Sequence, residues 1–234
     1  MLLGARLAAL ARQIPKGARV ADIGTDHGFM PVYLGKNGVS NRIIATDISP
    51  GSLSKARDLI AKEKLEDIIE TRLGPGLKVI SPGEIDTVVI AGMGGLLISL
   101  ILEEGTDVLE YVHRLVLQPM NNTDKLRKWL IDNGFAMEEE SLVKEGRYIY
   151  ETIVARPGYQ EVSDDIEYEV GFKLLKNRDT LFGEFIGFKI NKVENIISRL
   201  EKENSQNAQK VVDELSIKLK KYHEVLKCFA QWRR

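Results

Sequence analysis

The sequence predicts an α/β fold, a doubly wound and mostly parallel sheet that is followed by a helical appendage. Short apolar segments alternate with helical patterns through the first 132 residues, and two further strand patterns follow. This alternation is typical of a parallel sheet covered by helices on both faces. Beyond residue 158 the strand signal ends, and apolar residues recur at steps of three and four. We therefore predict a sheet domain, residues 1–158, and a helical domain, residues 159–234.

Five strands and five helices account for the alternating part of the sheet domain. The strands are expected at residues 20–23, 42–46, 68–73, 85–91 and 113–118. The helices are expected at residues 2–13, 29–37, 50–63, 96–103 and 123–132. Ser49 marks the start of the third helix, because serine is favoured as an N-cap. Glu145 and Gly146 join two final strands, residues 138–144 and 148–155, into an antiparallel hairpin at the edge of the sheet.

The helical domain is predicted to be an antiparallel coiled-coil hairpin. Apolar residues of its first helix are Phe182, Ile186, Ile190, Val193, Ile197 and Leu200. Those of its second helix are Val212, Leu215, Leu219, Tyr222, Leu226 and Phe229. Heptad spacing of this kind is typical of a coiled-coil seam, and the polar residues 202–207 suit a turn between the helices. We expect a monomer, with a coiled coil between two chains as the alternative.

Composition excludes several classes of protein. The formal net charge is −1, so no global field attracts nucleic acid, but both ends of the chain are basic, and the last two residues are arginines. A single cysteine, Cys228, rules out a disulfide framework and a cysteine metal cluster, and we expect it to pack in the helical core. The longest uncharged stretch, residues 87–102, is shorter than a membrane helix and contains glycines. A cytoplasmic protein without membrane segment or metal is expected.

Residues 20–29 predict the ligand site. A strand leads through Asp22 into a turn that Gly24 and Gly28 bracket. Ligands of open α/β sheets bind at the carboxyl ends of strands, where glycines allow close approach to the backbone. A nicotinamide site would have the pattern G-x-G-x-x-G, but Asp26 replaces its second glycine and would repel a diphosphate. A nicotinamide-dependent enzyme is therefore the least favoured of the candidate functions.

The acidic residues favour S-adenosylmethionine as the cofactor. This molecule carries ammonium and sulfonium groups, which the carboxylates of Asp22 and Asp26 would attract. Asp47 ends the second strand, where an acid suits the two ribose hydroxyls. A helix cap is the alternative role for an aspartate at a strand end. Two acids around a D-x-G-x-x-x-G turn favour the cofactor over that alternative.

Two later strand ends complete a more specific pattern. They carry the segments Gly92, Met93, Gly94 and Gly95, and Gln118, Pro119, Met120, Asn121 and Asn122. With these segments, the first glycine turn and the helical hairpin, the chain resembles the TrmK family, bacterial tRNA (adenine-22)-N1-methyltransferases. The resemblance covers the whole chain, including residues 145–151. It implies a class I, Rossmann-like methyltransferase that uses S-adenosylmethionine and carries a C-terminal coiled coil.

The resemblance also implies which residues line the cofactor. They are Asp22, Gly24, His27, Gly28, Asp47 and Ile48, with Gly92, Met93, Gly94 and Gly95 near the methyl group. The turn of Gly74 and Gly76 departs from the family, because Pro75 stands where an acidic residue is common. An acid there would bind the adenine amino group of the cofactor. Backbone groups of the two glycines are the expected replacement.

Chemistry at adenine N1 places modest demands on the site. This ring nitrogen has a lone pair and no proton to lose, so in-line attack needs no general base and catalysis is mostly positioning. The base has to be flipped out, since N1 lies on its Watson–Crick edge. Asp26 would stabilise the cationic product, and Gln118, Asn121 and Asn122 would read the base, with helix capping as the amides' alternative role. tRNA is the expected partner.

Phosphate contacts hold folded RNA, so the basic ends of the chain are assigned to tRNA binding. The residues chosen are Arg6, Arg12, Lys16, Lys218, Lys220 and Lys221. A solvated helix face is the alternative for each group taken alone. Tyr148 and Tyr150 offer rings for stacking on a base, although tyrosines of a hairpin strand more often belong to the core.

Two other functions stay open on the residues alone. A methyltransferase for a small metabolite would share the cofactor site but would give the helical hairpin and the basic ends no role. A non-enzymatic scaffold would use the coiled coil and retain the α/β domain without activity.

Overall fold

The computed structural model describes residues 3–203 and 205–232. Outside the described residues lie Leu2, where the first helix was predicted to begin, Asn204 of the predicted turn, and the terminal Arg233 and Arg234. The chain divides into two compact units, residues 1–161 and 162–234. Each unit is described by itself.

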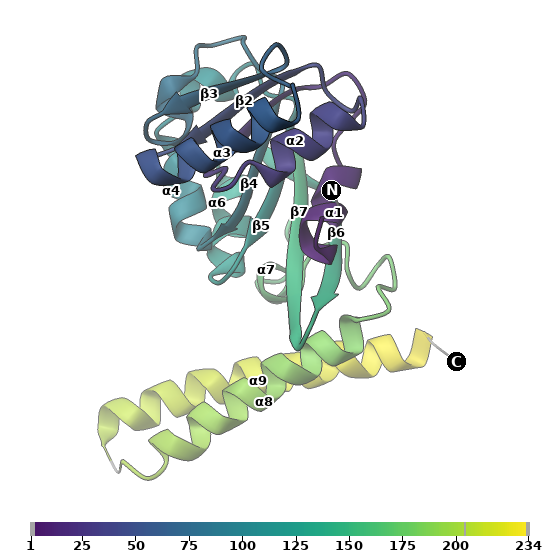
Figure 1. The fold of residues 1–234 in the computed structure, drawn as a ribbon. Coiled ribbons are helices and arrows are strands. Elements are labelled where there is room, and N and C mark those ends of the chain that lie inside the picture. The colour runs from purple at the N-terminus through teal and green to yellow at the C-terminus, as the bar shows by residue number, and fades with distance from the viewer. Residues whose placement is uncertain (1–2, 204, 233–234) are drawn as a thin grey trace. The chain divides into compact units, whose positions relative to one another are not determined.

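The first unit contains a seven-stranded sheet in the order β3-β2-β1-β4-β5-β7-β6 (Figure 1). Its strands are β1 (Arg19–Ile23), β2 (Arg42–Asp47), β3 (Ile69–Leu73), β4 (Thr87–Met93), β5 (Arg114–Pro119), β6 (Phe135–Glu145) and β7 (Tyr148–Pro157). The first five strands are parallel, and β7 is antiparallel to both of its neighbours, β5 and β6. The strand order reverses between β1 and β4, which is where open α/β sheets bind ligands.

Helices cover both faces of this sheet, as the alternating pattern predicts. They are α1 (Ala5–Arg12), α2 (Phe29–Lys36), α3 (Pro50–Lys62), the 3₁₀ helix η1 (Gly76–Val79), α4 (Gly95–Glu103), α5 (Thr106–Leu109) and α6 (Thr123–Asp132). Helices α1, α2 and α3 lie on one face, and α4 and α6 pack together on the other (Figure 1). Ser49 caps α3 by accepting a hydrogen bond from the N–H of Ser52 at 3.3 Å, as predicted.

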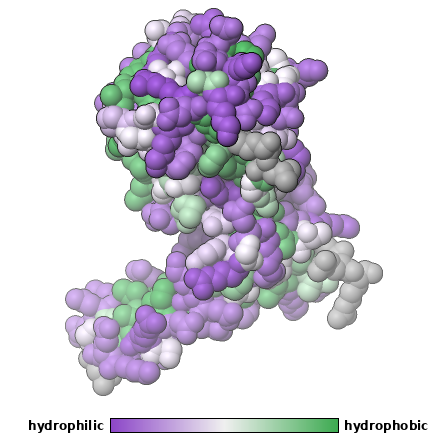
Figure 2. All heavy atoms as spheres, in the orientation of Figure 1, coloured by the Kyte–Doolittle hydropathy of each residue, from purple (hydrophilic) through white to green (hydrophobic). Residues whose placement is uncertain are grey.

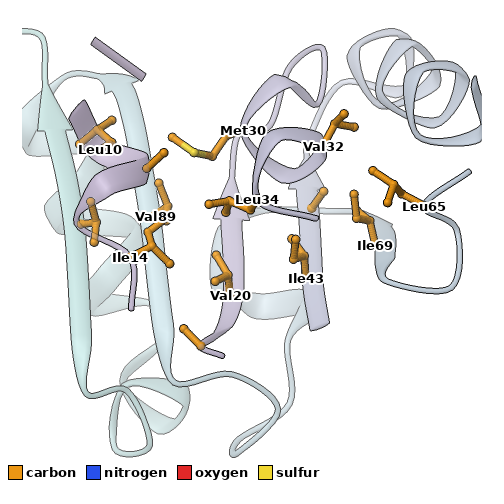
Figure 3. Packing of buried hydrophobic residues seen from close by; sticks show 14 of the residues in the cluster. Leu10, Ile14, Val20, Met30, Val32, Leu34, Ile43, Leu65, Ile69 and Val89 are labelled. Carbon is orange, nitrogen blue, oxygen red and sulfur yellow. The ribbon is translucent and has the colours of Figure 1, made fainter. Parts of the chain in front are cut away.

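Burial on both faces of the sheet explains why the strands of the first unit are runs of apolar residues. Val88, Val89 and Ile90 of β4 are all fully buried, because both faces of a covered parallel sheet are shielded from water. Figure 3 shows Leu10 of α1 and Leu34 of α2 packed over this sheet within one cluster. Removal of apolar side chains from water stabilises the folded state by roughly 25 cal/mol for each Å² of apolar surface that is buried.

The second unit is a helical hairpin. It comprises α7 (Ile166–Val170), α8 (Phe182–Leu200) and α9 (Gln206–Trp232). The ring centroids of Phe182, at the start of α8, and Phe229, near the end of α9, are 5.1 Å apart, so the two long helices are antiparallel. Buried residues of the predicted seam are Phe182, Ile186, Ile190, Val193, Val212, Tyr222 and Phe229. The supercoil of a coiled coil stays a prediction.

Several local features differ from the expectations. The short helices η1, α5 and α7 were not predicted, because they have no periodic pattern long enough to indicate a helix. The fourth strand continues past Ala91, because a bulge there lets Met93 pair with Pro119. Cys228 is exposed rather than packed in the core, since it lies beside the seam residue Phe229 and not on the seam.

The visible surface is mostly hydrophilic, with smaller hydrophobic areas (Figure 2). No helix within the described residues is both long and apolar enough to span a bilayer. Over the same part of the chain, no three His, Cys, Asp or Glu side chains gather as a metal site.

Candidate functional site

A cavity of about 670 Å³ opens at the carboxyl ends of the parallel strands, at the reversal between β1 and β4. This volume is typical of a cofactor site. Nine of the residues predicted for the cofactor line it: Asp22, Gly24, His27, Asp47, Ile48, Gly74, Gly76, Gly92 and Met93. Asp26 and Arg6, which were predicted for catalysis and for RNA binding, also line it.

The turn after β1 brings backbone to the cavity wall. The N–H of Gly24 donates to the carbonyl of Thr46 at 2.8 Å, which ties the turn to the end of β2. Gly24 has φ 72°, and a Cβ at this position would lie only 2.1 Å from Cε of Met93. Gly28 has φ 73° and lies behind the cavity, where a Cβ would meet Cβ of Ala56 at 3.0 Å. Both positions therefore favour glycine on conformational and steric grounds.

Asp22 presents a carboxyl group that is nearly removed from water. It is 5% exposed at the end of β1 and lines the cavity. Burial raises the pKa of Asp22 to about 6, interaction with the Thr25 side chain offsets part of the rise, and the charge of Asp47 adds to it. At neutral pH this group is mostly ionised despite its burial. A cationic ligand would supply a counter-charge for this carboxylate.

Asp47 and Asp26 are held together at the end of β2. Oδ2 of Asp47 accepts the N–H of Asp26 at 3.0 Å, and its Oδ1 accepts the N–H of Ser49 at 2.8 Å. Each carboxylate oxygen keeps a second lone pair for a ribose hydroxyl. The Asp26 side chain is 68% exposed and lies 3.6 Å from Nε2 of His27, whose ring stacks on Phe29 with centroids 5.4 Å apart.

An apolar side chain and two glycines form the wall after β2 and β3. Ile48 is 74% exposed, which is unusual for isoleucine and leaves its side chain open to a ligand. Gly76 has φ 57°, and a Cβ there would lie 2.8 Å from Ile101 of α4. Gly74, Pro75 and Gly76 all line the cavity. The N–H of Gly74 donates to the carbonyl of Asp47 at 3.0 Å, so a backbone replacement for the missing acid has to be a carbonyl oxygen of this turn.

Gln118, at the end of β5, is fully buried and its amide is engaged. Oε1 accepts hydrogen bonds from Nη1 of Arg6 at 2.6 Å and from the N–H of Gly92 at 3.1 Å. Nε2 donates to the carbonyl of Pro119 at 2.9 Å. Gln118 thus holds Arg6 against the end of β4. Its predicted contact with a base stays a prediction, and one of these bonds would have to be exchanged for it.

Gly94, Gly95, Asn121 and Asn122 form a packed junction outside the cavity lining. The N–H of Gly95 donates to the Asn121 carbonyl at 2.8 Å, and a Cβ on Gly95 would lie 2.3 Å from the Asn122 carbonyl oxygen. A Cβ on Gly94 would lie 2.9 Å from Oδ1 of Asn121. Asn122 occupies the N-cap position before α6 at φ 49°, but its side chain makes no capping hydrogen bond. These glycines permit the close approach of the two segments, and their predicted contact with the cofactor stays a prediction.

Two of the predicted RNA-binding lysines are paired within the helical unit. Lys218 pairs with Glu169 of α7, and Lys221 pairs with Asp164 in the segment before α7. The remaining residues of the predicted basic groups are exposed on their own units: Arg12, Lys16 and Lys220.

Several cavity residues escaped the sequence analysis. Leu97 and Leu100 of α4 line the cavity and are each 48% exposed, and Phe29 is 44% exposed. The sequence of α4 is apolar on every side, which could have indicated that part of this helix faces a ligand in addition to the core. Arg6 was chosen for its charge, but its place in the cavity depends on how α1 packs against β6.

The site fits S-adenosylmethionine. The Thr46 hydroxyl is buried in the cavity wall without a hydrogen-bond partner in the described part of the chain, as expected where a ligand completes the wall. Asp22 and Asp47 place carboxylates for cationic and hydroxyl groups, and Ile48 offers an apolar contact. Fold and site together define a class I, S-adenosylmethionine-dependent methyltransferase with a Rossmann-like sheet.

Residues 20–224 match the family described as tRNA (adenine(22)-N(1))-methyltransferase, and the chain belongs to this TrmK family. The enzyme of that description from Bacillus subtilis (strain 168) is 35% identical over 231 residues, 96% of this chain and 97% of its own. The crystal structure of the B. subtilis m1A22 tRNA methyltransferase TrmK has a TM-score of 0.90 at 32% identity, covering 96% and 99% of the two chains. A Streptococcus pneumoniae protein solved with S-adenosyl-L-methionine has a TM-score of 0.87 at 32% identity, covering 96% and 100%.

Proposed function

We propose that this protein transfers a methyl group from S-adenosylmethionine to N1 of adenine 22 in tRNA. The observation that carries the proposal is membership of the TrmK family over residues 20–224, combined with a strand-end cavity whose acids suit a cationic cofactor. The relative from B. subtilis carries the same activity in its name.

Residues at the ends of β1, β2 and β3 would hold the cofactor. Asp22 would attract its positive charge, Asp47 would accept hydrogen bonds from its ribose, and Ile48 would contact its adenine. Backbone groups of Gly74 and Gly76 would take the place of the missing acid at Pro75. When bound there, the cofactor supplies an electrophilic methyl group.

The remaining task of the site is to position the acceptor base. Adenine N1 has a lone pair and no proton, so no residue has to act as a general base, and orientation supplies most of the rate enhancement. The exposed carboxylate of Asp26 would stabilise the positive charge that develops on the ring. Asn121 and Asn122 would contact the base from the end of β5, and Gln118 would act there through Arg6.

Partner and location follow from the substrate. tRNA as substrate supports a cytoplasmic location.

The oligomeric state is a separate question. The apolar faces of α8 and α9 pack on each other within one chain, which supports a monomer over a coiled coil between two chains.

The experiment that tests the function is methyl transfer from labelled S-adenosylmethionine to unmodified tRNA transcripts, followed by nucleoside analysis. We expect label in 1-methyladenosine, and we expect it to disappear when adenine 22 is replaced by another base. A chain that binds the cofactor yet labels no tRNA would favour a small-metabolite methyltransferase. A chain that binds no cofactor would favour the scaffold.

A further inference from the structure

The hairpin of β6 and β7 extends past the sheet at the edge that holds the cavity. Continuing the pairing of Leu117 with Ile153 places residues 148–150 beyond Pro119, the last residue of β5. The loop after a parallel strand lies at its carboxyl end, so this part of β7 stands beside the loops that bear the site.

Tyr148 and Tyr150 point to the face of the sheet that α1 covers. Val116 of β5 pairs with Val154 of β7, and Val116 belongs to the same core cluster as Leu10 of α1. Paired residues and alternate residues of a strand share a face, so Tyr150 and Tyr148 follow Val154 on that face. The two rings have centroids 6.2 Å apart and planes inclined by 43°.

Arg6 joins these tyrosines to the cavity. Its guanidinium carbon lies 5.7 Å from the centroid of the Tyr150 ring, and its Nη1 donates to Gln118 at 2.6 Å. A Cβ on Gly92, near the end of β4, would lie 3.6 Å from the same Nη1. Because Arg6 lines the cavity, Tyr150 is separated from the site by a single side chain.

Charge divides the cavity into two sides. Asp22, Asp26 and Asp47 lie at the ends of β1 and β2, whereas Arg6 lies at the ends of β4 and β5. The other acid of the lining, Glu104 at the end of α4, is paired with Lys78 at 3.0 Å. A cationic cofactor favours the acidic side. A polyanionic substrate favours the side of Arg6, which is the side of the tyrosines.

Tyr148 is 51% exposed, so the expectation that it belongs to the core was wrong. Arg147 lies with its guanidinium carbon 5.0 Å from the centroid of this ring and donates to its hydroxyl at 2.8 Å. The ring extends into solvent because the two-residue turn of Gly146 and Arg147 ends the hairpin there. Aromatic rings next to arginines are the combination with which proteins stack and hold unpaired RNA bases.

We propose that Tyr150 and Tyr148 form a stacking platform for the target region of tRNA, in which Tyr150 receives the extruded adenine and Tyr148 the neighbouring base. Arg6 and Arg147, each of which lies over one face of one of these rings, contact the phosphates that come with the bases. The assignment rests on the proposed function and adds how the base is held. Stacking uses the π-face of a base, so it leaves the Watson–Crick edge free for methylation.

The test compares Tyr150→Ala and Tyr148→Ala with Tyr150→Phe and Tyr148→Phe. We expect each alanine variant to raise KM for tRNA roughly tenfold or more, which is the scale of one lost base stack. The phenylalanine variants should keep the wild-type KM, because they keep the ring. Affinity for S-adenosylmethionine, measured by titration calorimetry, should be the same in all four variants and the wild type.

Tyr111→Ala is the matched control, because Tyr111 is 49% exposed but precedes β5 and therefore lies at the opposite edge of the sheet. It should leave KM unchanged. Alanine variants that match this control, in an enzyme that methylates tRNA, would overturn the platform and leave the function standing. A wild-type chain that methylates no tRNA would overturn both. If the Tyr150→Ala variant failed to fold, the comparison of Tyr148→Ala with Tyr148→Phe would still test the platform, because Tyr148 is exposed.

Discussion

At the scale of single residues, the ionisation of Asp22 is predicted to affect both folding stability and ligand binding. An unfolded aspartate ionises near pH 3.8, whereas burial raises the pKa of Asp22 to about 6 in the folded chain. Between these two values the folded state keeps a proton that the unfolded state has lost. Raising the pH through that window therefore lowers stability, and above pH 6 the full cost is about 3 kcal/mol.

This shift predicts the pH dependence of cofactor binding. If the ionised carboxylate of Asp22 attracts the cofactor, affinity for S-adenosylmethionine should rise as the pH passes through about 6 and then level off. Asp22→Asn should bind more weakly with a flatter profile, and it should melt at a higher temperature at pH 7.5, because it carries no buried charge. Titration calorimetry from pH 5 to 8 and thermal melts measure both effects.

Asp58→Asn supplies the control for that series, since Asp58 is exposed on α3. It should reproduce the wild-type profile. A wild-type affinity that is constant from pH 5 to 8 would contradict the role given to Asp22.

The sequence was informative about residues whose role depends on local geometry. Gly24 and Asp47 were predicted for the cavity because turn chemistry and the strand ends locate them. Arg6 was predicted for RNA binding from its charge alone. Its place in the cavity was not predicted, because it depends on the packing of α1 against β6, which brings Arg6 to Gln118. The close contact of Gly95 with Asn122 was not predicted, because it involves a segment 27 residues away, from 95 to 122.

At the scale of elements, a buried ion cluster attaches α6 to the antiparallel edge. Arg127 is fully buried and donates to Glu140 of β6 at 2.6 Å and to Glu151 of β7 at 2.7 Å. Burial opposes the charge of Arg127, but the two carboxylates outweigh it and hold the pKa of this guanidinium above its usual value. The cluster fixes β7, and with it the two tyrosines, relative to α6.

Arg127→Met should therefore destabilise the chain by about 3–5 kcal/mol, because it leaves two buried carboxylates without their cation. Urea unfolding followed by circular dichroism measures the loss. Lys128→Met is the matched control, since Lys128 is the next residue of α6 and its side chain is 57% exposed. That change should alter stability by less than about 1 kcal/mol. Equal effects of the two variants would show that the cluster contributes nothing specific.

Alternation of strands and helices was enough to predict the parallel sheet and its helices. It did not predict where the hairpin strands pair, because the periodicity of β6 and β7 does not distinguish which of them meets β5. Nor did spacing reveal that Arg127 is buried, since a charged residue on an amphipathic helix normally faces water. Both facts depend on contacts between elements that are far apart in the sequence.

At the scale of the whole molecule, RNA binding is expected to draw on basic residues of both units. Lys218 and Lys221 are paired with acids near α7, so replacing either would also disturb the helical unit. Lys220 is exposed and gives the cleaner test. Lys220→Glu should weaken tRNA binding and reduce the slope of log Kd against log salt concentration by about one.

Lys210→Glu serves as the comparison, because Lys210 is exposed on the same helix but was not assigned to RNA binding. Filter binding at several salt concentrations separates the two variants. Equal losses from both would indicate diffuse attraction by α9 and not a contact at Lys220. No loss from Lys220→Glu would remove this residue from the RNA-binding surface.

The position of β7 between β5 and β6 has a consequence for how the protein is made. A ribosome releases β5 and then β6, but the strand that pairs with β6 in the sheet is β7, which is the last strand of the sheet to be synthesised. Until residue 157 has left the exit tunnel, β5 therefore keeps an open edge, and the 11 residues of β6 have no partner strand in the sheet. The nascent chain completes its sheet from the inside outward, and residues 148–150 take their place beside the cavity in that same final step.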